Sequence, residues 1–175
     1  MNASNRHSFR SRPRTVDIAA VLVLAAIIGY VGYAMLWLPS RPLDVSHTQY
    51  AIRTGDKFTH RQIDDAIGVM LDRKHHDWHG CRMDRIRYDE AWSNEQLRLE
   101  HQMTIDSPGS SSSMSDAIDT YGMDRVVIFQ SDFQCPTGGD GSFGTDEQTG
   151  WTDTYAYAPS SPKAAHGWVF IDSGY

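Results

Sequence analysis

An uninterrupted apolar run near the N-terminus is the feature that most constrains how this chain can fold. Residues 18–38 include no charged side chain. At about 1.5 Å of rise per residue, a helix of this length matches a hydrocarbon core of roughly 30 Å. Pro39 follows at once and would end the helix, because proline lacks a backbone donor and clashes with the preceding turn. The sequence therefore predicts a transmembrane helix over residues 18–38.

The charges on either side of this run predict its direction. Four arginines precede the span, whereas only Arg41 follows it closely, beside Asp44. Because an excess of positive charge stays in the cytoplasm, we expect a cytoplasmic head over residues 1–17 and a domain outside the cell membrane. The four arginines are Arg6, Arg10, Arg12 and Arg14.

Two other interpretations of the run are open. A cleavable secretory signal has a shorter apolar region of about 7 to 15 residues and ends at a small-x-small cleavage site. This run is longer and ends in bulky side chains over residues 35–38. A buried helix of a soluble protein would rarely lack a polar face along its whole length. A permanent single-pass anchor in the lipid bilayer is therefore the favoured interpretation.

The rest of the chain has the size and composition of one acidic domain. The formal net charge of the whole chain is -6, and the arginines of the head make the remainder more acidic than that. An acidic surface repels phosphate backbones, and no basic stripe with interleaved aromatic residues is present in the sequence. We therefore expect no nucleic-acid partner. About 135 residues outside the head and span suffice for one ordinary domain.

A long helix is predicted at the start of this domain. A polar stalk over residues 39–57 precedes it, and Thr59 with Gln62 form the pattern of a capping box. The basic residues of 73–76 suit the negative end of the helix dipole, and Gly80 is a plausible stop. Apolar side chains recur between them at helical spacing and form one stripe. They are Ile63, Ala66, Ile67, Met70 and Leu71.

Most of the remaining elements are predicted to be strands. Residues 81–88 alternate in polarity, with a break between Met83 and Ile86 that indicates a bulge. Ser93 and Gln96 form a second capping-box pattern, which predicts a short helix. Further strands are expected at 125–133, 151–158 and 167–175, with a helical turn at 116–121 and loops at 107–113 and 138–150.

This order of elements predicts an α+β domain over residues 58–175. A long helix packed on a curved antiparallel sheet of about four strands satisfies it, in the general layout of cystatin-like or NTF2-like folds. The first strand would follow the helix directly, and the apolar run at 125–133 would lie at the centre of the sheet.

Several short motifs resemble those of a family of small exported, membrane-anchored proteins of Gram-positive bacteria. The stretch 78–81 (Trp-His-Gly-Cys), running into Met83, Ile86 and Tyr88, is similar to a motif of that family, as are residues 131–133 and the C-terminal stretch 167–175. The resemblance covers roughly residues 59–175. It implies an anchored, exported α+β domain, and it supplies no catalytic residues, because the family has no assigned activity. This chain departs from the family in its serine-rich loop and its second cysteine.

Cys81 and Cys135 are the only cysteines in the chain. Outside the cytoplasm such a pair is usually a disulfide. It would join the start of one strand to the end of another and contribute on the order of 4 kcal/mol in a chain-entropy description. Two separate buried thiols are the alternative. The sequence favours the disulfide.

Two histidines form the best candidate for a metal site. On a helix, His75 and His79 would be four residues apart and share a face, which is a spacing used to hold zinc. A third ligand is not evident, and histidines near a helix C-terminus also suit the helix dipole. Neither a nucleophilic triad nor a phosphate-gripping loop is recognisable. We therefore expect no cofactor, and a solvated helix end is the favoured interpretation of the histidines.

Four aromatic side chains on the predicted strands are the candidate ligand-binding face. A concave sheet face carrying them could bind a small ligand or an envelope protein, and the same side chains could equally form the core beneath the helix. A binding module without enzymatic activity is the favoured hypothesis. A metal-dependent envelope enzyme using His75 and His79 and a structural accessory subunit of a membrane complex are the alternatives. The aromatic residues are Tyr88, Trp151, Tyr155 and Trp168.

Overall fold

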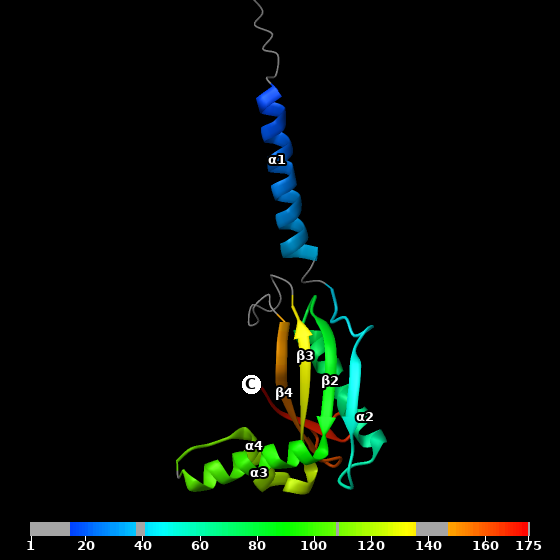
Figure 1. The fold of residues 1–175 in the computed structure, drawn as a ribbon, viewed down its shortest axis with the longest axis vertical. Helices are drawn as coiled ribbons and strands as arrows, with labels where there is room; N and C mark the ends of the chain where they lie inside the picture. The colour runs from blue at the N-terminus through cyan, green and yellow to red at the C-terminus, as the bar shows by residue number, and fades with distance from the viewer. Residues whose placement is uncertain (1–14, 38–40, 108, 136–146, 175) are drawn as a thin grey trace, which may run out of the picture.

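The structure is a computed structural model that describes residues 15–37, 41–107, 109–135 and 147–174. An N-terminal helix is followed by an α+β domain with one sheet (Figure 1). The helices are α1 (Thr15–Gly32), which continues as a π-helical turn (Tyr33–Trp37), α2 (His60–Asp77), α3 (Glu90–Asp106) and α4 (Ser113–Tyr121). The strands are β1 (Gln49–Arg53), β2 (Arg82–Asp89), β3 (Val126–Gln134), β4 (Glu147–Tyr157) and β5 (Trp168–Gly174).

The N-terminal helix matches the apolar run seen in the sequence. The stretch Ile18–Trp37 has a mean hydropathy of 2.3, and none of it is buried against the rest of the protein. Its length and composition are sufficient to cross a membrane. A signal sequence near the N-terminus meets the same criteria. The helix is therefore a membrane anchor or a signal sequence.

The sheet is mixed and has five strands, which corrects the prediction of about four antiparallel strands. Its order is β1-β2-β3-β4-β5, and it is not closed. The last four strands pair antiparallel, whereas β1 runs parallel to β2 and aligns Ile52 with Tyr88. The additional strand comes from the predicted stalk. It lacks an apolar alternation because Ile52 alone of its side chains is partly buried. A cystatin-like or NTF2-like layout is not confirmed.

Helix α2 connects the two parallel strands and covers one face of the sheet. Its capping box is confirmed, because Thr59 Oγ1 accepts a hydrogen bond from the Gln62 amide at 3.3 Å and Gln62 Oε1 accepts one from the Thr59 amide at 3.0 Å. The predicted stripe is buried against the sheet, where each large aliphatic side chain contributes about 1.5–3 kcal/mol. Its fully buried members are Ile63, Ala66, Ile67 and Met70.

The second capping box is wrong, because α3 begins at Glu90 and runs for 17 residues. Asp89 caps the helix by accepting a hydrogen bond from the Trp92 amide at 3.1 Å. Ser93 lies inside the helix, and its hydroxyl accepts a hydrogen bond from the Ile128 amide at 2.9 Å. Since the pairing of β2 with β3 ends at Arg87 and Gln130, the serine replaces a strand as the partner of a buried amide.

The other predicted strands agree with the structure within a few residues. The bulge in β2 lies between Met83 and Arg85, as the broken alternation indicated. The helical turn predicted at 116–121 is part of α4, and Gly122 follows it with a φ of 94°. Most of the loop predicted at 138–150 lies outside the described residues, and its last four residues belong to β4.

Helices α3 and α4 cover only part of the second sheet face. They lie across the end of the sheet where β2 finishes and β3 begins (Figure 1). A small apolar cluster fills the space beneath them, and it does not extend along the rest of that face. The cluster consists of Leu97, Ala117, Ile118, Val126, Ile128 and Ala156.

Candidate functional site

The aromatic residues predicted to bind a ligand lie on the face that α2 covers. Tyr88, Tyr155 and Trp168 are each no more than 1% exposed and belong to the main core. Trp151 is partly buried and packs edge-on against Trp78 and Phe133, with ring centroids 5.9 and 6.0 Å apart. The structure brings the four together under α2, which is the core arrangement that the sequence left open. No open surface reaches the three fully buried ones.

A charged pair is buried among these aromatic rings. Lys74 of α2 and Asp153 of β4 are joined at 2.9 Å between Nζ and Oδ2, and their side chains are 3% and 0% exposed. The ammonium also lies 3.4 Å from the centroid of the Trp78 ring, where a cation–π contact adds to the attraction. Burial lowers the pKa of Lys74 to about 8 and raises the pKa of Asp153.

Neither Lys74 nor Asp153 was predicted to lie in the core, although the sequence pattern indicates a core position for both. Lys74 follows Met70 by four residues and so continues the apolar stripe of α2. Asp153 lies between Trp151 and Tyr155 on β4, in step with side chains that face the core. Both charges therefore occupy core positions in the pattern. Because the pair is sealed from solvent, it is not accessible to a ligand.

The two histidines of the metal hypothesis are separated by the end of a helix. Helix α2 ends at Asp77, so His79 does not share a helical face with His75. Both side chains are exposed. Within residues 15–37, 41–107, 109–135 and 147–174, no group of three or more His, Cys, Asp or Glu side chains is placed to hold a metal ion. Among these residues, the structure supplies no third ligand for the candidate metal site at His75 and His79.

A disulfide joins Cys81 to Cys135, as the sequence predicted. The two sulfur atoms are 2.02 Å apart, and both cysteines are 1% exposed. The bond ties the residue before β2 to the residue after β3, beside Trp78 and Phe133 in the main core. It therefore fastens the two central strands at the end opposite to α3 and α4.

The uncovered part of the second sheet face is the candidate functional site. It is polar because the residues that alternate with the core positions of β2 and β3 are charged or amide side chains. A cleft of about 430 Å³ opens there across β1, β2, β3 and β4. We call this surface the polar cleft. It is lined by His47, Gln49, Asp84, Arg85, Arg87, Asp132, Glu147 and Thr149.

A half-buried ion pair forms the floor of the polar cleft. Arg87 donates to Asp132 Oδ1 at 2.5 Å, and the same oxygen accepts a hydrogen bond from the Gly150 amide at 2.9 Å. The two charged side chains are 34% and 10% exposed. Arg87 Nε is buried and has no hydrogen-bond partner among the described residues. A buried donor of this kind costs stability wherever it occurs.

The rim of the polar cleft presents groups of both signs. Arg85 is exposed and donates to Gln49 Oε1 at 3.3 Å, which leaves most of its guanidinium edge open. Its planar fork suits a carboxylate or phosphate. Asp84 and Glu147 line the same cleft and can accept hydrogen bonds from an amine or hydroxyl. No sequence pattern singles out these residues, because outward charges on a half-buried strand are usually only solvated.

Neither models of known protein families, nor curated proteins, nor solved structures match this chain. The resemblance to exported Gram-positive proteins therefore stays a prediction. Fold alone does not fix function, so a function for this chain must come from its own geometry and charges.

Proposed function

We propose that this chain is a single-pass module of a bacterial cell envelope whose domain lies outside the cytoplasm and binds a polar ligand or an envelope protein. The arginine-rich head supports this direction. The Cys81–Cys135 disulfide supports an oxidising compartment. Protease treatment of whole cells tests the topology: the domain should be digested from outside, and a protected domain would reverse it.

The polar cleft is the observation that supports binding. An antiparallel sheet can leave one face in water, but here the uncovered part holds a half-buried ion pair and an unsatisfied arginine nitrogen. A ligand with an anionic group could pair with Arg85, while its hydrogen-bond donors reach Asp84 or Glu147. Such a ligand is a small zwitterionic molecule or a mixed-charge patch of a protein. No reacting group is required of the site.

Photo-crosslinking in living cells tests this proposal. Replacing Gln49 on the cleft wall with p-benzoylphenylalanine should give one discrete adduct, and the added Arg85→Gln substitution should reduce its yield. The same label at Asp65, which is exposed on the second turn of α2, should not give it. The mass of the adduct separates a small ligand from a protein.

Two results would contradict the proposal. The first is the same set of products from the labels at Gln49 and Asp65, which would indicate non-specific contact. The second is a yield at Gln49 that does not change when Arg85→Gln is added, because the arginine is the anion-binding group of the cleft. An unchanged unfolding midpoint for Arg85→Gln ensures that a lost adduct reflects binding.

A further inference from the structure

The segment after the N-terminal helix is fixed to the domain and does not form a free stalk. Gly80 donates its amide hydrogen to the Arg41 carbonyl at 2.7 Å. Asp44 exchanges two backbone hydrogen bonds with the start of β2, both at 2.8 Å: its amide donates to the Cys81 carbonyl and its carbonyl accepts from the Met83 amide. Leu43 between them is 4% exposed and belongs to the main core. The domain therefore begins at Arg41.

This attachment places one end of the domain close to the end of the helix. Only residues 38–40 separate Trp37 from Arg41, so their Cα atoms are at most about 14 Å apart. The Arg41 guanidinium lies 4.7 Å from the centroid of the Trp37 ring, which is itself stacked on Tyr33. Tyr and Trp at the end of a span sit at the level of the lipid headgroups. With α1 in a bilayer, Arg41 is therefore at headgroup depth.

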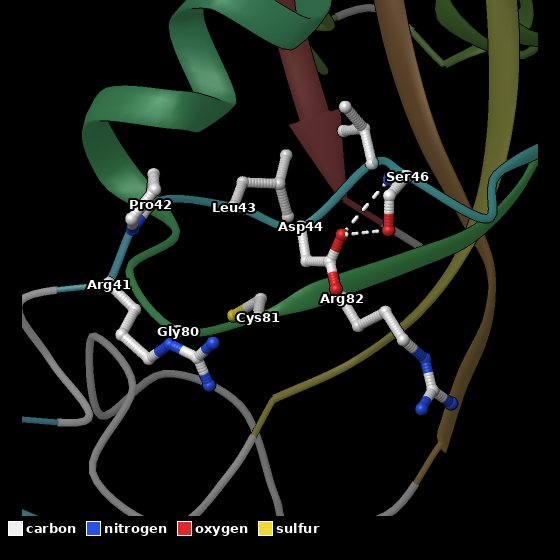
Figure 2. A pocket seen from close by; sticks show the side chains of 9 residues that line it. Arg41, Pro42, Leu43, Asp44, Ser46, Gly80, Cys81 and Arg82 are labelled. Atoms are coloured by element: carbon white, nitrogen blue, oxygen red, sulfur yellow. Dashed lines mark hydrogen bonds between the residues drawn. The ribbon is translucent and has the colours of Figure 1, made fainter.

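A cleft opens beside Arg41, between the fixed segment and the start of β2. Its volume is about 620 Å³. Figure 2 shows the Arg41 and Arg82 side chains on either side of Cys81. Arg82 donates to Asp84 Oδ1 at 2.7 Å and to Gln134 Oε1 at 3.3 Å. We call this space the membrane-side cleft. It is lined by Arg41, Pro42, Leu43, Asp44, Val45, Ser46, Gly80, Cys81 and Arg82.

Asp44 is the one carboxylate among the described residues that line the membrane-side cleft, and it is engaged within its own turn. Asp44 Oδ1 accepts hydrogen bonds from the Ser46 amide at 2.9 Å and from the Ser46 hydroxyl at 2.6 Å. The two arginines are both exposed, and arginine is well suited to bidentate contact with phosphate. The cleft thus presents the Arg41 guanidinium at the depth where phospholipid phosphates lie, with the exposed Arg82 guanidinium, which is paired with Asp84, on the other side of Cys81.

We propose that the membrane-side cleft binds the phosphate of phospholipid headgroups through Arg41 and Arg82, and so docks the domain directly on the bilayer. The site shares no lining residue with the polar cleft, although Arg82 pairs with Asp84 of that cleft, and it requires only that α1 be retained in a membrane. It applies on either side of that membrane, since both leaflets carry phosphates. Docking would hold the domain in one orientation relative to the bilayer.

Lipid crosslinking of the full chain in nanodiscs of phosphatidylethanolamine and phosphatidylglycerol tests this inference. Val45 lines the membrane-side cleft and is 40% exposed, and p-benzoylphenylalanine in its place should form phospholipid adducts. The same label at Leu99, which is 42% exposed on α3, should not. The double substitution R41Q/R82Q should lower the adduct yield at position 45 at least about fivefold, given the attraction of each arginine to a phospholipid surface.

A matched pair of arginines provides the control. R53Q/R61Q removes the same charge from exposed positions outside the membrane-side cleft and should leave the yield at position 45 unchanged. An adduct yield that R41Q/R82Q does not reduce would overturn the proposal, because tethering alone would then explain the contact. Absence of any phospholipid adduct at position 45 would also overturn it, since a free phosphate and not a lipid headgroup would then be the remaining ligand. Equal unfolding midpoints of the two double variants exclude misfolding as the cause.

Discussion

The same strands form a buried aromatic face of the sheet and a polar face that is partly uncovered. On one face α2 seals an aromatic core around the Lys74–Asp153 pair, whose side chains are at most 3% exposed. On the other, α3 and α4 leave a polar part uncovered, where the Arg87–Asp132 pair is 34% and 10% exposed. Strand alternation produces both faces from neighbouring residues. Burial, and not charge alone, therefore separates a structural ion pair from one that a ligand can reach.

The largest expected effect comes from breaking the sealed pair. Lys74→Met leaves Asp153 buried without its partner, and removing one member of a buried pair costs about 3–5 kcal/mol. Urea unfolding of the full chain in detergent measures this loss of unfolding free energy. A loss below about 1 kcal/mol would mean that water reaches Asp153 under α2 as it reaches the polar cleft on the other face.

The double variant K74M/D153L is the control for that prediction. Replacing both charges with apolar side chains removes the unpaired carboxylate, and such replacements are often neutral or stabilising. We expect it to recover most of the stability lost in Lys74→Met. Failure to recover would indicate that shape at these positions, and not charge pairing, holds the α2 face together.

Removing the disulfide should have an effect of similar size. The bond closes a loop with a sequence separation of 54, so Cys81→Ser with Cys135→Ser should lower the unfolding free energy by about 4 kcal/mol in the chain-entropy description. Because both cysteines belong to the core under α2, the loss tests that face again. Reduction of the wild-type chain during unfolding should reproduce it, and identical curves with and without reductant would contradict it.

The sealed pair should also make stability depend on pH. Burial lowers the pKa of Lys74 from 10.5 to about 8. Between these values the unfolded chain retains a proton that the folded chain has released, so the unfolding free energy rises with pH and the gain is lost as pH falls through about 8. Relative to K74M/D153L, the wild type should gain up to about 3 kcal/mol over this window. Lys57 is present in both chains and cancels. Urea unfolding at several pH values checks the difference, and a constant difference would contradict the assignment.

A smaller effect is expected where α3 supports the second face. The Ser93 hydroxyl is the partner of the buried Ile128 amide. Ser93→Ala leaves that donor unsatisfied and should cost about 2 kcal/mol. Hydrogen exchange of the Ile128 amide should accelerate by the factor that corresponds to this loss. Unaltered exchange would show that the amide is satisfied in another way.

The smallest effect on stability is expected in the polar cleft. Arg85 is exposed and makes one long hydrogen bond to Gln49, so Arg85→Gln should change the unfolding free energy by less than about 0.5 kcal/mol. Urea unfolding of Arg85→Gln and Lys74→Met under the same conditions compares the two sheet faces. A cost of more than about 1 kcal/mol would assign Arg85 to the structure of the sheet.

Regular spacing was the part of the fold that the sequence predicted well. The stripe of α2 with its Thr59–Gln62 box and the central strand β3 follow from local patterns. The Cys81–Cys135 bond was predicted because the chain has no other cysteines. The start of α3 did not, because Asp89 and Ser93 are both good caps and tertiary demand decided between them. Ser93 lies inside α3, where its hydroxyl is the hydrogen-bond partner of the buried Ile128 amide of β3.

Features that depend on distant partners were not predictable from one sequence. Strand β1 forms because its backbone pairs with β2, although Ile52 alone of its side chains is partly buried. The Lys74–Asp153 pair joins residues whose proximity only the fold creates. The polar cleft depends on where α3 and α4 stop covering the sheet, which strand alternation cannot show. Local sequence patterns therefore predict most of the helices and strands, whereas the packing of α3 and α4 determines which part of the sheet stays uncovered.

The central claim is that a polar ligand or an envelope protein binds the polar cleft and not the α2 face. Arginine labelling in native membranes tests this claim. Phenylglyoxal should modify both Arg85 and Arg61 in the purified full chain, because both are exposed. In native membranes, Arg85 should be protected by the occupant of the polar cleft, whereas Arg61 on α2 should react as before. Equal modification of Arg85 in both preparations would contradict a binding role for the polar cleft.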